Sequence, residues 1–156
     1  MSRSAGVAVG AVALGALGAV AWAQLAQPSP WQVLSGRLVL TEEAARGDFR
    51  VALLFAAIGL VGGLVLGVVG QLSLRASIVG VALVAVASVL ASVVAWRLGI
   101  VLGPPDPSSV AGLTDGDEVP SRLAVGSVVP FFAWPIGALV GVLLGTWVEP
   151  GSASDR

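Results

Sequence analysis

Uncharged apolar stretches alternate with shorter charged segments along the 156 residues of this chain. A helix needs about 20 apolar residues to cross the hydrocarbon core of a bilayer. Four stretches are this long, and they cover residues 5–25, 51–72, 76–96 and 123–148. The charged residues lie between these stretches or at the chain ends, with two long connections at 26–50 and 97–122. Because a charge near the centre of a span costs about 2.5–3.5 kcal/mol on insertion scales, this separation predicts four transmembrane helices.

The lengths of the connections predict how the helices are arranged. The second and third stretches are joined by only three residues, 73–75, so they should form a tight antiparallel hairpin. Both long connections then lie on one side of the membrane, and both chain ends lie on the other. We therefore predict an all-α membrane protein, with four transmembrane helices in an antiparallel bundle and a single integral membrane domain over 1–156. Pro130 and Pro135 each remove a backbone donor and predict a kink in the fourth helix.

The first long connection carries signals of its own. The pair Ser35 and Gly36 separates two short apolar runs (31–34 and 37–40), a pattern typical of a small β-hairpin. An isolated hairpin is marginal in water, so we expect it to rest on the helix ends or on a partner. Thr41 can then cap a helix that either runs into the second span or breaks before it.

The first apolar stretch has a second interpretation. Arg3, the apolar run and the segment Ala21-Trp22-Ala23 together also resemble a signal peptide with its cleavage site. The run is about 20 residues long, however, whereas the apolar region of a signal peptide normally has about 7–15. We therefore expect a retained span rather than a cleaved one.

Composition strengthens the membrane interpretation and removes several kinds of chemistry. Hydrophobic residues make up 56% of the chain and charged residues 11%, with a mean hydropathy of +0.97, whereas soluble domains are about a quarter charged. Neither cysteine nor histidine occurs, which excludes disulfides, thiol nucleophiles and imidazole catalysis. A net charge of −1 argues against nucleic-acid binding. We predict no enzyme activity, no catalytic residue, no metal site and no cofactor.

Small residues recur every four positions within the spans, which places them along one face of each helix. The two clearest series are Gly59, Gly63 and Gly67 in the second span and Gly137, Gly141 and Gly145 in the fourth. Gly6 and Gly10 repeat this spacing in the first span. The missing side chains let another helix backbone approach closely. Two uses stay open, packing within one four-helix bundle and contact with a second copy or a partner.

The chain also contains a faint internal repeat. Ala21-Trp22 ends the first span and Ala95-Trp96 ends the third, each followed soon by proline, and the glycine series recurs in spans two and four. Because each unit would hold two spans, such a duplication would relate the two halves about an axis along the membrane normal.

Polar side chains inside the spans are few. Gln71 lies near a span end, where we expect a hydrated amide. Ser88 and Ser92 lie one turn apart near mid-membrane, and they either line a narrow pore or bond to carbonyls of their own helix. Trp96 and Arg97 mark the membrane surface, where Arg97 is a candidate contact for a lipid phosphate or for an acid of the long connections.

The arginines give conflicting signals about orientation. The side with both chain ends carries Arg3, Arg75 and Arg156, and the side with the long connections carries the other five. A literal count would place the long connections inside the cell. Arg3 and Arg75 nevertheless lie in the shortest segments, and the long connections also hold most of the acidic residues. We therefore predict a multi-pass protein of the plasma membrane with cytoplasmic N- and C-termini.

Three short segments resemble an actinobacterial family of four-span membrane proteins of unknown function. These segments are residues 37–43, 95–99 and 102–104. The resemblance extends over most of the chain and implies four spans and a plasma-membrane location, without any activity, cofactor or catalytic residue. Members of that family often carry a basic cluster between spans two and three, where this chain has only Arg75.

Together these features favour a non-catalytic scaffold or accessory subunit that packs through glycine and alanine faces of its helices. The alternative is a small pore or transporter-like protein that forms by oligomerisation. The expected partners are the lipid bilayer and either further copies of this chain or a membrane complex, with no nucleic acid.

Overall fold

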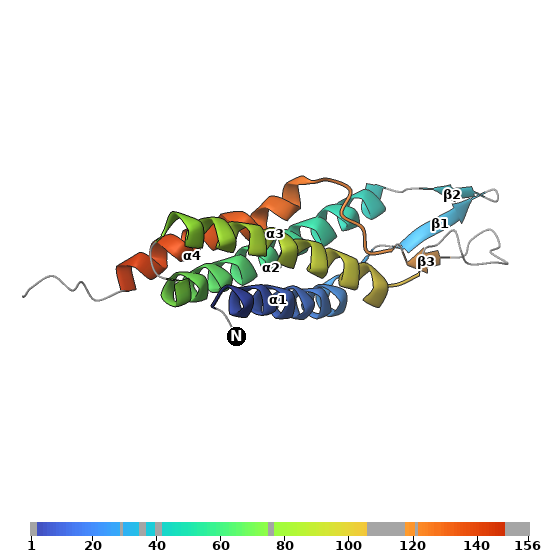
Figure 1. The fold of residues 1–156 in the computed structure, drawn as a ribbon. Coiled ribbons are helices and arrows are strands. Elements are labelled where there is room, and N and C mark those ends of the chain that lie inside the picture. The colour runs from blue at the N-terminus through green and yellow to red at the C-terminus, as the bar shows by residue number, and fades with distance from the viewer. Residues whose placement is uncertain are drawn as a thin grey trace, which may run out of the picture.

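The computed structural model describes residues 3–28, 30–34, 37–39, 42–74, 77–105, 118–120 and 122–148. In this part of the chain four α-helices form an elongated bundle, in which consecutive helices run antiparallel (Figure 1). They are α1 (Arg3–Leu25), α2 (Glu42–Leu74), α3 (Ile78–Leu102) and α4 (Ala133–Val148), the last preceded directly by the 3₁₀ helix η2 (Val129–Phe132). Each of these four segments, with η2 counted in the last, is long and apolar enough to cross a membrane. The predicted all-α, four-span bundle is thus confirmed.

The helices are apolar on their outward faces as well as on their packed faces. Ile78, Val101 and Trp147 are 90%, 79% and 87% exposed. A helix that is hydrophobic all round belongs in a protein core or in lipid. Four such helices, each long and apolar enough to cross a bilayer, favour lipid. The chain is therefore a multi-pass membrane protein.

The third helix is longer at its C-terminal end than the predicted span. It begins at Ile78, where the hydroxyl of Ser77 accepts a hydrogen bond from the N–H of Gly80 at 3.0 Å. It then continues past Trp96 to Leu102, and the N–H of Gly103 closes the last turn on the carbonyl of Gly99 at 2.9 Å. Residues after 97 are again apolar and the first proline comes at 104, so nothing local ends the helix earlier.

The fourth helix begins later than predicted, at Ala133 instead of 123, and residues 122–128 are not helical. Pro130 lies in the first turn of η2, and Pro135 lies in the first turn of α4. The expected kink within one long helix is therefore a junction between a 3₁₀ turn and an α-helix. Proline is tolerated at helix starts because the missing N–H would have no partner within the helix.

At its N-terminal end the second helix is longer than the predicted span. It is continuous from Glu42 to Leu74, so it runs into the membrane without a break. Thr41, the expected cap, lies outside the described residues.

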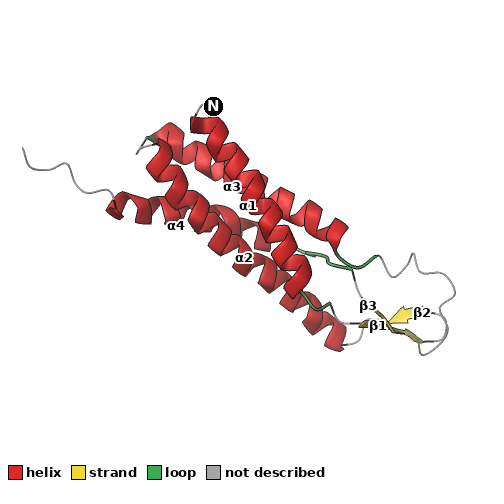
Figure 2. Cartoon of the chain, turned by 90° about the horizontal axis from the view of Figure 1, so that it is seen from below, coloured by secondary structure: helices red, strands yellow, loops and turns green. Residues whose placement is uncertain are grey.

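Both long connections contribute to one small sheet beyond the end of the bundle (Figure 2). The predicted hairpin is present as β1 (Pro30–Leu34) and β2 (Arg37–Val39), paired antiparallel, and its turn residues 35 and 36 lie outside the described residues. The second connection adds β3 (Glu118–Pro120), which pairs with the other edge of β1 and gives the order β2-β1-β3. This third strand was not predicted, because three residues are too few to carry a strand pattern.

The most extensive helix contacts join α2 with α4 and α1 with α3. Both pairs run parallel. Along the α1–α3 contact, Gly15 lies against Ala91 and Trp22 lies against Gly99, so the residue numbers rise together. Each main contact therefore joins the first two-helix unit of the chain to the second.

The two units are related by an approximate two-fold axis along the bundle. Gly67 lies against the carbonyl of Ala138, and Gly141 lies against the carbonyl of Leu64. In each case the residue of the second unit stands 74 positions after its counterpart in the first. The same contact is thus made twice, in agreement with the internal repeat in the sequence.

Candidate functional site

The two glycine series meet at the contact between α2 and α4. A Cβ atom on Gly63 or Gly67 would collide with backbone atoms of α4, and one on Gly137 or Gly141 would collide with backbone atoms of α2. These glycines let the two backbones touch, so dispersion contacts can hold the helices together where lipid removes the hydrophobic driving force. The structure thus uses this face within the chain.

The first glycine of the α2 series and the last glycine of the α4 series face side chains instead of backbone. A Cβ on Gly59 would lie 2.6 Å from Nε1 of Trp134, and a Cβ on Gly145 would lie 2.9 Å from Cβ of Gln71. On its other side the Trp134 indole reaches Gly18 of α1, at 3.2 Å from an added Cβ. Trp134 is fully buried and forms a wedge that joins α4 to both α1 and α2.

The small-residue face at the start of α1, formed by Gly6 and Gly10, has no other helix of the described chain packed against it. A Cβ on Gly6 or Gly10 would meet nothing within 4 Å. Both glycines line a groove of about 600 Å³ between α1 and α2, here called the α1–α2 groove. Leu14 and Leu17 also line a second hollow of about 420 Å³ that ends on Trp134, so the apolar cleft between the two helices continues toward mid-membrane.

Four aromatic rings and one arginine form a row across the end of the bundle that carries the sheet. Trp22 meets Phe55 edge-on at 5.0 Å, Phe55 meets Phe131 at 5.3 Å, and Phe131 meets Trp96 at 5.7 Å. The guanidinium of Arg97 stacks on Trp96 at 4.7 Å from the ring centre. The row joins α1, α2, η2 and α3, at spacings that favour aromatic contact. Sequence reasoning placed Trp96 and Arg97 at the membrane surface but missed the row, because its members are far apart in the chain.

Trp22 also fixes α1 to α2 by a hydrogen bond. Its buried indole N–H donates to the carbonyl of Val51 at 3.0 Å, and its ring covers Gly99 of α3. A side chain with this many contacts ties α1 to both α2 and α3.

The two serines at mid-membrane are buried and bonded to their own helix. The hydroxyl of Ser88 donates to the carbonyl of Ala85 at 2.7 Å, and that of Ser92 donates to the carbonyl of Val89 at 2.8 Å. The sequence left two interpretations of these serines, a pore lining and a bond to a carbonyl of the same helix. The structure shows the bond to a preceding carbonyl. Both side chains are buried by the bundle, so neither faces an open path within the described residues.

Gln71 is buried, in contrast to the hydrated amide expected from its position near a span end. Its side chain packs on Gly145 of α4. Because Gly145 has no side chain, Gln71 can lie against the α4 backbone and out of contact with solvent. Within the described residues its Nε2 has no hydrogen-bond partner, and neither has Nε1 of Trp134. Buried polar atoms without partners reduce stability, so these two side chains are weak points of the bundle.

Within the described residues, no group of three or more acidic side chains could hold a metal ion. What this arrangement offers is surface for association: an open small-residue face on α1, an exposed stacked arginine, and a sheet that combines both long connections. Comparison of the chain with protein-family models, with curated proteins and with solved structures gives no match.

Proposed function

We propose that this chain is a non-catalytic accessory subunit or scaffold of the plasma membrane. Its α1–α2 groove would receive a transmembrane helix of a larger membrane protein. The observation that carries this proposal is the open space over Gly6 and Gly10. The other two glycine series are already occupied between α2 and α4, so they are not the partner surface.

The chemistry of the groove suits a helix. Small residues of α1 line one wall at Gly6, Gly10 and Ala13, and larger apolar residues of α2 line the other, mainly Val65, Leu66 and Val69. A helix that presents small residues could therefore approach α1 closely over Gly6 and Gly10. Such contacts depend on close packing and not on transfer from water. The absence of cysteine and histidine from the sequence fits a role in assembly better than one in catalysis.

Gentle detergent extraction of the tagged protein from its native membrane, followed by native mass spectrometry, tests this proposal. A heavier assembly that contains another polypeptide supports it. Gly10→Leu should then reduce the partner's recovery, because the new side chain fills the groove. Val9→Leu is the matched control, since Val9 is 58% exposed on the same helix and does not line the groove. A pure homo-oligomer, or equal recovery with both variants, would argue against the proposal.

The pore alternative has its own measurement. If a pure homo-oligomer is found, flux through liposomes that contain the protein should be compared with flux for Ser88→Leu. Flux that this variant abolishes would favour the pore, and the buried, helix-bonded hydroxyl of Ser88 leads us to expect no such effect.

We further infer that both chain ends face the cytoplasm, and that the chain is related to the four-span actinobacterial family. The native sequence has no cysteine, so single cysteines report orientation cleanly. An impermeant maleimide should label Gln27→Cys in intact cells and should label Ser73→Cys only after permeabilisation. The reverse labelling pattern would show that both chain ends lie outside the cytoplasm.

A further inference from the structure

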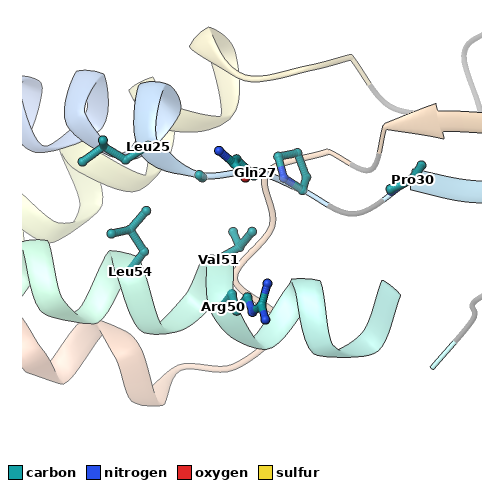
Figure 3. A pocket seen from close by; sticks show the side chains of 8 residues that line it. Leu25, Gln27, Pro30, Arg50, Val51 and Leu54 are labelled. Carbon is teal, nitrogen blue, oxygen red and sulfur yellow. The ribbon is translucent and has the colours of Figure 1, made fainter. Parts of the chain in front are cut away.

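A polar pocket lies where α1 ends and the apolar part of α2 begins, at the end of the bundle that carries the sheet (Figure 3). Its volume is about 490 Å³. Gln27 and Arg50 supply its polar side chains, and Leu25 and Leu54 supply an apolar wall. The α1–α2 groove and the hollow above Trp134 are, by contrast, lined almost entirely by apolar and small residues.

The position of this pocket corresponds to the surface of the membrane. Arg50 is the last charged residue before the apolar run of α2, and α1 ends at Leu25. The neighbouring Val51 is buried and accepts the hydrogen bond of Trp22, which lies at the end of the first predicted span. A molecule in the pocket would therefore have its polar end among headgroups and its apolar end beside hydrocarbon.

The side chain of Arg50 borders the pocket. Arg50 is exposed, and it has no ion pair or hydrogen bond to any described residue. Asp48, the nearest acid in the described sequence, lies two positions away on the same helix, and residues at that spacing do not face each other. A planar guanidinium suits the paired oxygens of a phosphate. Gln27, on the segment that follows α1, adds an amide to the same pocket.

The second repeat provides a natural comparison. Seventy-four positions after Gln27 and Arg50 stand Val101 and Ala124, which carry no donor. A pocket of about 370 Å³ is lined by Val125 and Val128, the counterparts of Val51 and Leu54. Its lining also includes Ser127 but neither an arginine nor a side-chain amide. The donor pair therefore belongs to one repeat only and does not follow from the repeated fold.

We propose that this pocket binds the phosphate of an anionic glycerophospholipid. Arg50 and Gln27 hold the phosphodiester, and Leu25 and Leu54 contact the glycerol and the first carbons of the acyl chains. This inference is independent of the helix-docking proposal, because it uses the opposite end of α1.

Native mass spectrometry of the full chain in detergent tests it, with added phosphatidylglycerol or phosphatidylcholine. Phosphatidylglycerol adducts should form at lower lipid concentration than phosphatidylcholine adducts. Arg50→Gln should weaken them by roughly fivefold, the effect of one arginine near an anionic surface. Arg50→Lys should fall between, since it keeps the charge and loses the planar fork. Competition with excess inorganic phosphate distinguishes a lipid phosphodiester from free phosphate as the ligand. Phosphatidylglycerol adducts should persist in excess phosphate, and their displacement would assign the site to free phosphate.

Arg46→Gln is the matched control. It removes the same charge from the same helix one turn farther from the membrane, and Arg46 does not line the pocket. It should change phosphatidylglycerol binding less than twofold. Equal losses in both variants would show general attraction to anionic lipid, and unchanged binding in Arg50→Gln would overturn the site. Because Arg50 is exposed, thermal unfolding of Arg50→Gln and Arg50→Lys should match the parent, which excludes misfolding as the cause of weaker binding.

Discussion

Replacing a glycine of this chain by alanine adds a methyl group, and the effect on stability should depend on what that methyl group contacts. Gly67→Ala should destabilise the protein by about 1–3 kcal/mol, because the added Cβ collides with the backbone of α4 at Ala138. Gly10→Ala should be neutral or slightly stabilising, because its Cβ meets nothing and alanine is the better helix former. Thermal unfolding in detergent measures both. Equal effects at the two positions would contradict the α2–α4 contact.

Gln71 offers a residue-scale test with the opposite sign. Its buried amide nitrogen has no partner among the described residues, so replacing the amide should remove a cost of about 1–3 kcal/mol. Gln71→Met keeps the length of the side chain and its contact with Gly145, and it should raise the unfolding temperature. A lower temperature would mean that the amide binds a group outside the described contacts.

Elements differ in how far the sequence could predict them. The four spans were predictable because hydropathy is a local property, and the hairpin was predictable because Ser35 and Gly36 separate two clear runs. The helix ends at Leu102 and Ala133 were not, because a run of apolar residues does not by itself distinguish a helix from a non-helical apolar segment. Strand β3 depends on pairing with β1, which no local pattern encodes.

The candidate sites follow the same division. Glycine spacing showed which face of α2 and α4 was small, but every span has such a face, so the choice of partners could not be predicted. The structure resolves this choice by pairing α2 with α4 and α1 with α3. The pocket of Gln27 and Arg50 was missed, because it requires the end of α1 to lie beside the start of the apolar run in α2.

The link between α1 and α2 can be tested at Trp22. Trp22→Phe keeps an aromatic ring beside Phe55 and loses the bond to the Val51 carbonyl, so it should cost about 0.5–1.5 kcal/mol. Trp147→Phe is the control, because Trp147 is 87% exposed and should tolerate the change. Unfolding followed by near-ultraviolet circular dichroism in detergent measures both variants. An unchanged Trp22→Phe protein would argue against this hydrogen bond as a link between the helices.

At the scale of the whole molecule, the bundle consists of two similar units that depend on each other. The α1–α3 and α2–α4 contacts each join one unit to the other, and the small sheet also takes strands from both long connections. Contacts within a unit, between α1 and α2 or between α3 and α4, are less extensive. The glycine series of α2 and α4 therefore lie inside the contact between the two units. The α1–α2 groove, with Gly6 and Gly10, is the open small-residue surface that we propose for a partner.

Dividing the chain between its two units tests this architecture most directly. The halves 1–75 and 76–156, expressed together with a tag on the first, should copurify from the membrane, because the main helix contacts lie between them. Gly67→Leu in the first half should abolish copurification, whereas Gly10→Leu in the same half should leave it intact. Halves that fail to copurify, or that copurify equally well with Gly67→Leu, would contradict the pairing of α2 with α4.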